Sequence, residues 1–175
     1  FDEGGVIVVA SDDELLGQAI KAFVVARINP IRFKRGAKAE FDETIDKMLA
    51  AAETFDVGKI KVPRDLLTKP GKLTPDERAV ISQHPRYGAQ LILESEEQLD
   101  LAAVVAYEHH IMLNGGGYPR FRFPRPCHPA GNLVHVCDVY DAVTSERAYN
   151  KGWDPSDAIR QMAGWKGHFD PLVFQ

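Results

Sequence analysis

The stretch VVAYEHHIMLNGGGYP, at residues 104–119, contains the pattern that decides the fold of this chain. Its first part lies in a segment from about Asp100 to Met112 that is predicted to be a helix. Three consecutive glycines and a proline follow, and residues of this kind end a helix in a turn. Two adjacent histidines, His109 and His110, are therefore expected near the end of a helix.

Helical patterns lie on both sides of this stretch. Residues 40–53 have apolar side chains at helical spacing, and Thr74-Pro75-Asp76-Glu77 is a capping box that predicts a helix start. The pair His84-Pro85 should kink or break that helix. Further helices are predicted over residues 132–145 and from Asp154-Pro155 onward. The main body of the chain is therefore expected to be all-α.

The first part of the chain has a different character. Val6–Ala10 is a short apolar run that predicts one strand, and Ser11 with Glu14 forms a capping box for a helix that stops before Asn29-Pro30. No motif in residues 1–54 indicates a reaction. We expect residues 1–54 to be an N-terminal appendage, regulatory or dimerising, and residues 55–175 to be the functional domain.

Composition excludes several classes of protein. The chain has 175 residues, of which 45% are apolar and 26% charged, as in a one-domain globular protein and not a disordered one. Its net charge of −4 argues against a protein that coats nucleic acid. No apolar run reaches the roughly 20 residues that span a bilayer. With no leader pattern and no CxxC pair for Cys127 and Cys137, we expect a cytoplasmic location.

All six histidines lie at or after residue 84: His84, His109, His110, His128, His135 and His168. Adjacent residues of a regular helix point about 100° apart, so a single metal rarely binds two neighbours such as His109 and His110. A two-metal cluster could take one each, and the alternative is a pair of hydrogen-bonded core histidines. We expect His128, His135 and His168 to be structural.

Acidic residues form the other candidate groups. Asp138 and Asp141 are one helical turn apart in the apolar segment VCDVYDAV, where a carboxylate is costly unless it is paired or bound to metal. A salt bridge is the competing explanation for either aspartate. Asp56 and Lys59 could respectively bridge metals and contact a phosphate, although this pair alone is a weak signal.

Taken in order, these motifs resemble those of the HD-GYP domain, a subclass of the HD metal-dependent phosphohydrolases. The resemblance runs over residues 56–175. Its motifs are Asp56-Val57-Gly58-Lys59, Lys69-Pro70-Gly71-Lys72-Leu73-Thr74, His84 with Gly88, His109-His110, Gly117-Tyr118-Pro119, residues 138–145 with Arg147 and Tyr149, and Phe169-Asp170-Pro171.

The resemblance implies an HD-type helical bundle that cleaves cyclic di-GMP to the linear dinucleotide or to GMP. It implies that Asp56 bridges two metals, that His84, His109 and His110 bind the second metal, and that Asp138 completes the first. Lys59, Tyr118 and Arg147 match the family's substrate-binding positions, and we assign Asp56 and Lys59 as catalytic. We also expect a signalling protein or a second copy of the chain as a partner, and we expect no binding to polymeric nucleic acid.

The chemistry agrees with these roles. Hydrolysis of a phosphodiester needs a hydroxide at neutral pH and stabilisation of charge on the attacking and leaving oxygens, and two metals about 3.5–4 Å apart supply both. Mixed histidine and aspartate ligands suit first-row ions, so we expect Fe or Mn, one or two per chain. Lys59 and Arg147 would neutralise phosphate charge.

Four positions depart from the family pattern. Phe55 replaces the histidine of the His-Asp pair, and no histidine precedes His84, so two expected ligands are missing. Ile111 and Asn114 replace a glutamate and an aspartate that need not bind metal. One metal keeps four candidate ligands, whereas the other keeps only Asp138 and a share of Asp56.

Two explanations for the missing histidines are open. The protein could be a degenerate member that binds cyclic di-GMP or a signalling partner without hydrolysis. Alternatively, the sequence could be discontinuous near residues 54–56, with several dozen family residues absent and a spatial break at that point. A separate question concerns Arg120, Arg122 and Arg125, which alternate with Phe121 and Phe123 in a loop that is either solvated or a lid over an anion.

Overall fold

The computed structural model describes residues 46–47, 50–95, 99–145 and 151–174. In these residues the chain is helical, which confirms the expected fold class, and an isolated β-bridge joins Ile111 to Gly117. The elements are η1 (Val57–Lys61), α3 (Arg64–Leu67), α4 (Pro75–Ile81), α5 (His84–Leu93), α6 (Asp100–Glu108), α7 (Pro129–Thr144), α8 (Pro155–Ala163) and α9 (Pro171–Phe174). The strand and helix predicted within residues 1–29 lie outside the described residues.

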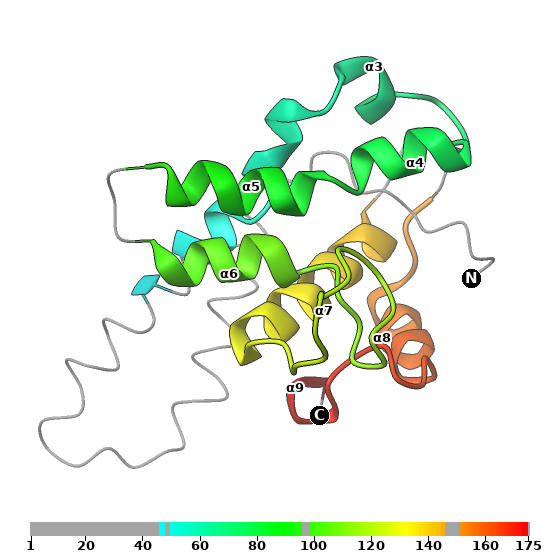
Figure 1. The fold of residues 1–175 in the computed structure, drawn as a ribbon. Coiled ribbons are helices and arrows are strands. Elements are labelled where there is room, and N and C mark those ends of the chain that lie inside the picture. The colour runs from blue at the N-terminus through cyan, green and yellow to red at the C-terminus, as the bar shows by residue number, and fades with distance from the viewer. Residues whose placement is uncertain (1–45, 48–49, 96–98, 146–150, 175) are drawn as a thin grey trace, which may run out of the picture.

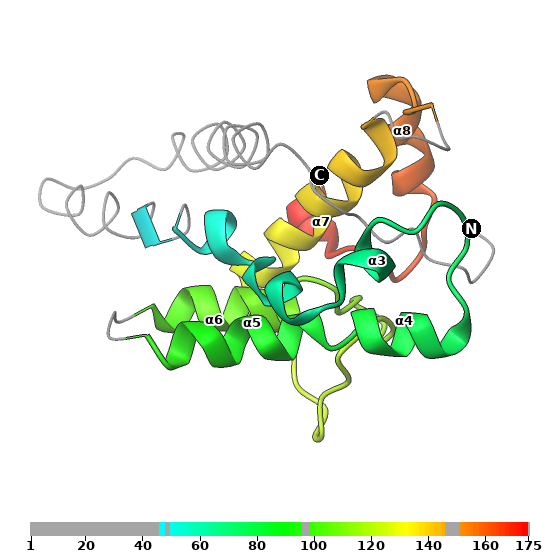
Figure 2. The same ribbon diagram turned by 90° about the horizontal axis from the view of Figure 1, so that it is seen from above.

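The bundle is organised around α7. Helices α5 and α6 lie side by side, and α7 crosses beside them and also contacts α8 and α9 (Figures 1 and 2). The first half of α7 packs into a core with residues 51–55, which precede η1, and with α5 and α6. Its second half packs with α8 and the C-terminal segment. The short helix η1 lies against α5.

Two predicted helix boundaries are confirmed. Thr74 caps α4 in a capping box with Glu77, and Pro75 occupies the first turn. Helix α4 ends at Ile81 and α5 begins at His84, so the helix is interrupted at the position that the His84-Pro85 pair predicted.

The helix that carries the tandem histidines is shorter than predicted. It ends at Glu108, with His109 as its C-cap, and not at Met112. The amides of Leu113 and Asn114 donate to the carbonyls of His168 and Gly167, at 3.0 and 2.9 Å, and therefore do not continue the helical ladder. The expectation that His109 and His110 lie on one regular helix is wrong for this reason.

Phe55 and Asp56 join a helix to η1. Helical residues 50–54 lead into a turn at Phe55 and Asp56 and then into η1, and the Lys59 amide donates to the Asp56 carbonyl at 2.9 Å. The discontinuity near residues 54–56 stays a hypothesis. Phe55 is 1% exposed and belongs to the core.

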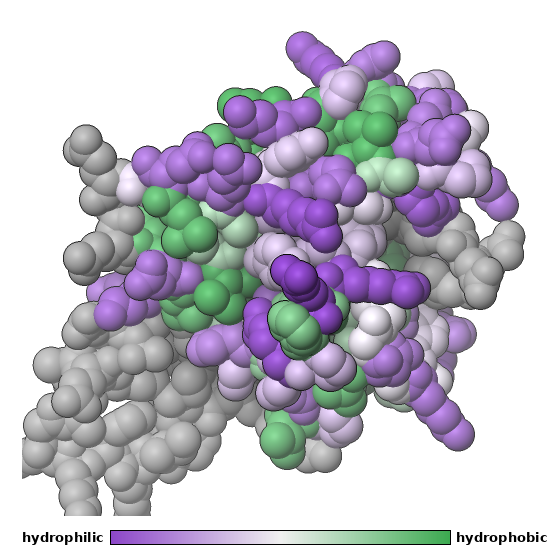
Figure 3. Space-filling view, in the orientation of Figure 1, coloured by the Kyte–Doolittle hydropathy of each residue, from purple (hydrophilic) through white to green (hydrophobic). Residues whose placement is uncertain are grey.

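On the face shown in Figure 3, hydrophobic residues form small separate patches among hydrophilic ones. No helix in the described part of the chain is long and apolar enough to cross a bilayer.

Replacing Gly58 with alanine should destabilise the fold by about 1–3 kcal/mol, because overpacking at a close contact forces the backbone to move. A Cβ at this position would lie 1.9 Å from the His84 carbonyl oxygen and 2.4 Å from the Gly88 amide nitrogen. Ile60→Ala in the same short helix is the control, since Ile60 is 78% exposed. Urea unfolding measures both variants, and equal stabilities would contradict the close packing of η1 on α5.

Candidate metal centre

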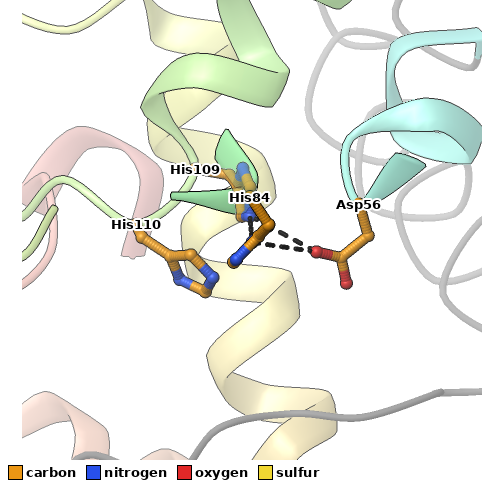
Figure 4. A group of neighbouring side chains, drawn as sticks. All are labelled: Asp56, His84, His109 and His110. Carbon is orange, nitrogen blue, oxygen red and sulfur yellow. Dashed lines mark hydrogen bonds and ion pairs between the residues drawn. The ribbon is translucent and has the colours of Figure 1, made fainter. Parts of the chain in front are cut away.

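Four of the predicted ligands converge on one point. Asp56 directly precedes η1, His84 is the first residue of α5, and His109 and His110 lie at and just beyond the end of α6. One ligand atom from each residue lies within 4.8 Å of those of the others. His84 and His109 lie between Asp56 and His110 in Figure 4. Because α6 ends early, both tandem histidines reach the same group and need not serve separate sites.

Backbone hydrogen bonds fix the orientation of two of the imidazoles. The Nδ1 atom of His84 lies 2.9 Å from the Ile81 carbonyl oxygen, and the Nδ1 atom of His109 lies 2.9 Å from the Ala106 carbonyl oxygen. A carbonyl only accepts, so each Nδ1 carries a proton and donates it. In the neutral rings, each Nε2 atom therefore presents a lone pair to the centre of the group.

This arrangement requires a cation. The Nε2 atoms of His84 and His109 are 3.2 Å apart, and Asp56 Oδ1 lies 3.2 Å from the first and 3.7 Å from the second. Two lone pairs and a carboxylate oxygen repel one another unless a proton or a metal ion lies between them. Histidines held by backbone carbonyls through the other ring nitrogen are typical metal ligands, so the donor set fits a divalent first-row ion.

Asp56 is held in its ionised form. Burial opposes ionisation, but contacts with His109 and His84 and the charge of Lys59 outweigh it, so the pKa of Asp56 lies well below its usual value. The Lys59 ammonium forms an ion pair with Asp56 Oδ2, which leaves Oδ1 directed at the two histidines. Lys59 thus stands next to the group, as its expected role requires.

The tandem histidines favour the neutral form that binds metal. Burial is the main reason that the pKa of His109 lies below its usual value, although Asp56 opposes the shift. Burial, followed by the nearby charges of His109 and His84, lowers the pKa of His110 further. Neutral imidazole is the ligand form, so these shifts extend metal binding to lower pH.

Asp138 lies on the other side of His110. It is buried on α7, and its Oδ2 is 3.7 Å from His110 Nδ1. It is not a member of the compact group of four. Asp141, one turn further along α7, instead accepts a hydrogen bond from the Ser145 hydroxyl at 3.2 Å.

Phe55 closes the site beside His109. The centres of its ring and the His109 ring are 4.9 Å apart with the planes at 76°, an edge-on contact that no metal could share. This side of the group is therefore apolar, where the family resemblance implies a further histidine ligand.

Tyr118 covers the group from the glycine-rich turn. Its ring centre is 4.6 Å from that of His110, and burial, aided by the charges of Asp138 and Asp56, raises the pKa of its phenol. The phenol therefore keeps its proton and can donate a hydrogen bond. Arg147, the third predicted substrate contact, lies outside the described residues.

Two buried polar residues without a predicted role at the site support this region. Glu108 accepts from the His128 amide at 2.6 Å and pairs with Arg125 at 2.6 Å, so Arg125 is tied to the end of α6. His135 Nδ1 lies 2.7 Å from the His109 carbonyl oxygen. The sequence signal for Glu108 is a charged residue directly before the tandem histidines, whereas no signal distinguishes His135 from a structural histidine.

Comparisons with known proteins show what the chain is similar to. The model of the HD domain family matches residues 25–173, which begins upstream of the domain boundary expected at residue 55. A cyclic di-GMP phosphodiesterase of Pseudomonas aeruginosa is 44% identical over 69% of this chain and 29% of its own length. The cyclic di-GMP phosphodiesterase response regulator RpfG of Xanthomonas campestris is 36% identical over 74% of the chain and 35% of its own length.

A third relative has a different substrate in its name. The 3'3'-cGAMP-specific phosphodiesterase 2 of Vibrio cholerae is 32% identical over 74% of the chain and 25% of its own length. The chain thus spans about a third or less of these curated relatives.

Replacing His84 with alanine should weaken Mn²⁺ binding by more than the roughly 10- to 100-fold that is typical when a residue supporting a ligand is lost. The measurement is titration of metal-free protein by calorimetry. His128→Asn is the matched control: it removes an imidazole that caps α7 through Nδ1, and asparagine is also a good cap. Equal losses in the two variants would contradict the assignment of His84 as a ligand.

The metal-free protein should lose stability as the pH falls from 7 to 5. Histidines with lowered pKa, such as His110, stay neutral in the folded state, whereas the unfolded chain takes up protons below about pH 6.5. The contribution of these histidines to the free energy of unfolding is therefore at its full value above that pH. Below it, the contribution decreases by at most about 1.4 kcal/mol per pH unit for each such group. Urea unfolding in a chelator should show a smaller decrease for His110→Gln. Stability that rises on acidification would contradict the burial of neutral imidazoles.

Proposed function

The chain belongs to the HD domain family, and from that premise we propose that it is a metal-dependent phosphodiesterase that hydrolyses cyclic di-GMP. The observation that carries the proposal is the convergence of two oriented Nε2 atoms on the Asp56 carboxylate, 3.2 Å from the nearer of them. The names of the relatives from Pseudomonas and Xanthomonas support the choice of substrate.

In the proposed site, Asp56, His84, His109 and His110 hold a divalent ion, for which Fe or Mn fits the mixed donors. When bound, such an ion supplies Lewis acidity at a phosphoryl oxygen and lowers the pKa of water so that a nucleophile forms at neutral pH. Asp138 faces this region from the side of His110 and would serve a second ion.

The remaining residues bind the anion. Lys59 is adjacent to Asp56, so its ammonium can neutralise a phosphate as it enters the site. Tyr118 keeps its phenolic proton and can donate to a phosphate oxygen next to His110. We propose that Arg147, as in the family pattern, contacts the nucleotide.

Asp56→Asn should reduce the hydrolysis of cyclic di-GMP by at least about 100-fold, because one change removes the anionic ligand that orders the site. The assay incubates Mn²⁺- or Fe²⁺-loaded protein with cyclic di-GMP and follows the linear dinucleotide and GMP by chromatography. His128→Asn should retain activity. In parallel, 3'3'-cGAMP tests the alternative substrate, and faster cleavage of cGAMP would overturn the choice of cyclic di-GMP.

A second function is favoured by Phe55. Since an apolar side chain fills the position of an expected ligand, the domain could bind cyclic di-GMP or a signalling partner without hydrolysing it. Tight binding of the nucleotide by metal-loaded protein with no turnover would establish this function in place of hydrolysis.

Phe55→His should raise metal binding from about one towards two ions per chain and increase turnover, because it adds an imidazole to the partial second site. Phe55→Leu is the control, since it keeps an apolar residue there. Elemental analysis and the chromatographic assay measure the two effects. If the histidine variant binds no more metal than the leucine variant, Phe55 does not block a second site.

A further inference from the structure

His135 contacts the metal centre without belonging to it. It lies on α7 one turn before Asp138 and is 4% exposed. These two residues approach the tandem histidines in different ways. Asp138 faces the ring of His110, whereas His135 reaches the backbone carbonyl of His109, at 2.7 Å from Nδ1.

The His109 carbonyl lacks the partner that a longer helix would give it. In a continued helix the amide of Leu113 would donate to it, but that amide donates to the His168 carbonyl at 3.0 Å. A buried carbonyl without a donor is costly. His135 supplies the donor at the peptide that joins His109 to His110.

The position of one proton on His135 follows from its partner. Because the His109 carbonyl can only accept, Nδ1 carries a proton and donates it. The Nε2 of the same ring is buried and has no hydrogen-bond partner among the described residues.

Packing fixes the ring plane. His168 stacks parallel to His135 with ring centres 5.7 Å apart, and Phe169 lies 5.4 Å away. The same His168 accepts the Leu113 amide through its carbonyl. The segment that contains His168 therefore has two effects. It takes the Leu113 amide away from a continued α6, and it positions the His135 ring that donates to the His109 carbonyl.

The unpaired Nε2 of His135 is a cost of having a histidine at this position. The unsatisfied Nε2 acceptor costs about 1–3 kcal/mol, and an apolar side chain would avoid that cost only by leaving the His109 carbonyl without its donor. That cost is understandable if the Nδ1 donor has a use beyond packing. The contact between α6 and α7 does not depend on it, because Glu108 separately accepts from the His128 amide.

We propose that His135 is a positioning residue that sets the directions of His109 and His110 by donating its Nδ1 proton to the His109 carbonyl. The proposal rests on the proposed metal centre. It gives this α7 residue a role in metal affinity although it binds no metal.

The test compares His135→Asn with His135→Gln. The asparagine amide places an N–H near the position of Nδ1, whereas the glutamine amide places it near Nε2, so the pair differs in donor position and not in polarity. Mn²⁺ titration of the metal-free proteins should give an affinity within about threefold of wild type for asparagine and about 10- to 100-fold weaker for glutamine. The visible spectrum of the Co²⁺ form should change only in the glutamine variant.

The outcomes separate this role from the proposed function. A wild-type protein that binds no Mn²⁺ defeats the metal centre itself. If the wild-type protein binds Mn²⁺ normally and the asparagine and glutamine variants have the same Mn²⁺ affinity as each other, whether unchanged or reduced, only the role of His135 is defeated. If the glutamine variant does not fold, ¹⁵N NMR of the wild-type imidazoles decides: the proposal expects the proton of His135 on Nδ1, and a proton on Nε2 would overturn it.

Discussion

The repulsion among three electron-pair donors is the constraint on which this site depends. His84 and His109 each commit one ring nitrogen to a backbone carbonyl, which leaves their other nitrogens 3.2 Å apart and close to Asp56. A bound metal ion would satisfy all three donors together. In the metal-free protein a proton can take that position, so metal and proton compete for it and metal affinity should depend on pH.

The fold holds this group together by close backbone packing. Gly58 lets η1 approach the first turn of α5, which brings Asp56 to His84. Phe55 anchors the preceding residue in the core and contacts His109 edge-on. The same packing has two consequences: it positions the carboxylate, and it places an apolar ring where the family resemblance implies another ligand. In our proposal, residue 55 is the position that separates hydrolysis from binding without hydrolysis.

Local patterns in the sequence were sufficient for much of the fold. The capping box at Thr74 and the proline after His84 act through their nearest neighbours, and both boundaries are where the pattern predicts them. The end of α6 could not be predicted in this way, because it is set by the carbonyls of Gly167 and His168, more than fifty residues away. The joint use of His109 and His110 follows from that contact. The role of Glu108 likewise depends on Arg125 and His128, which a single sequence does not pair with it.

Asp56, His84, His109 and His110 should bind one divalent ion through imidazole and carboxylate. Electron paramagnetic resonance of the protein with one equivalent of Mn²⁺ measures this binding, with electron–nuclear methods to detect coupled nitrogen. We expect a bound, magnetically isolated Mn²⁺ signal with coupling to ¹⁴N of histidine. A spectrum that shows only free aqueous Mn²⁺, or bound Mn²⁺ without nitrogen coupling, would contradict it.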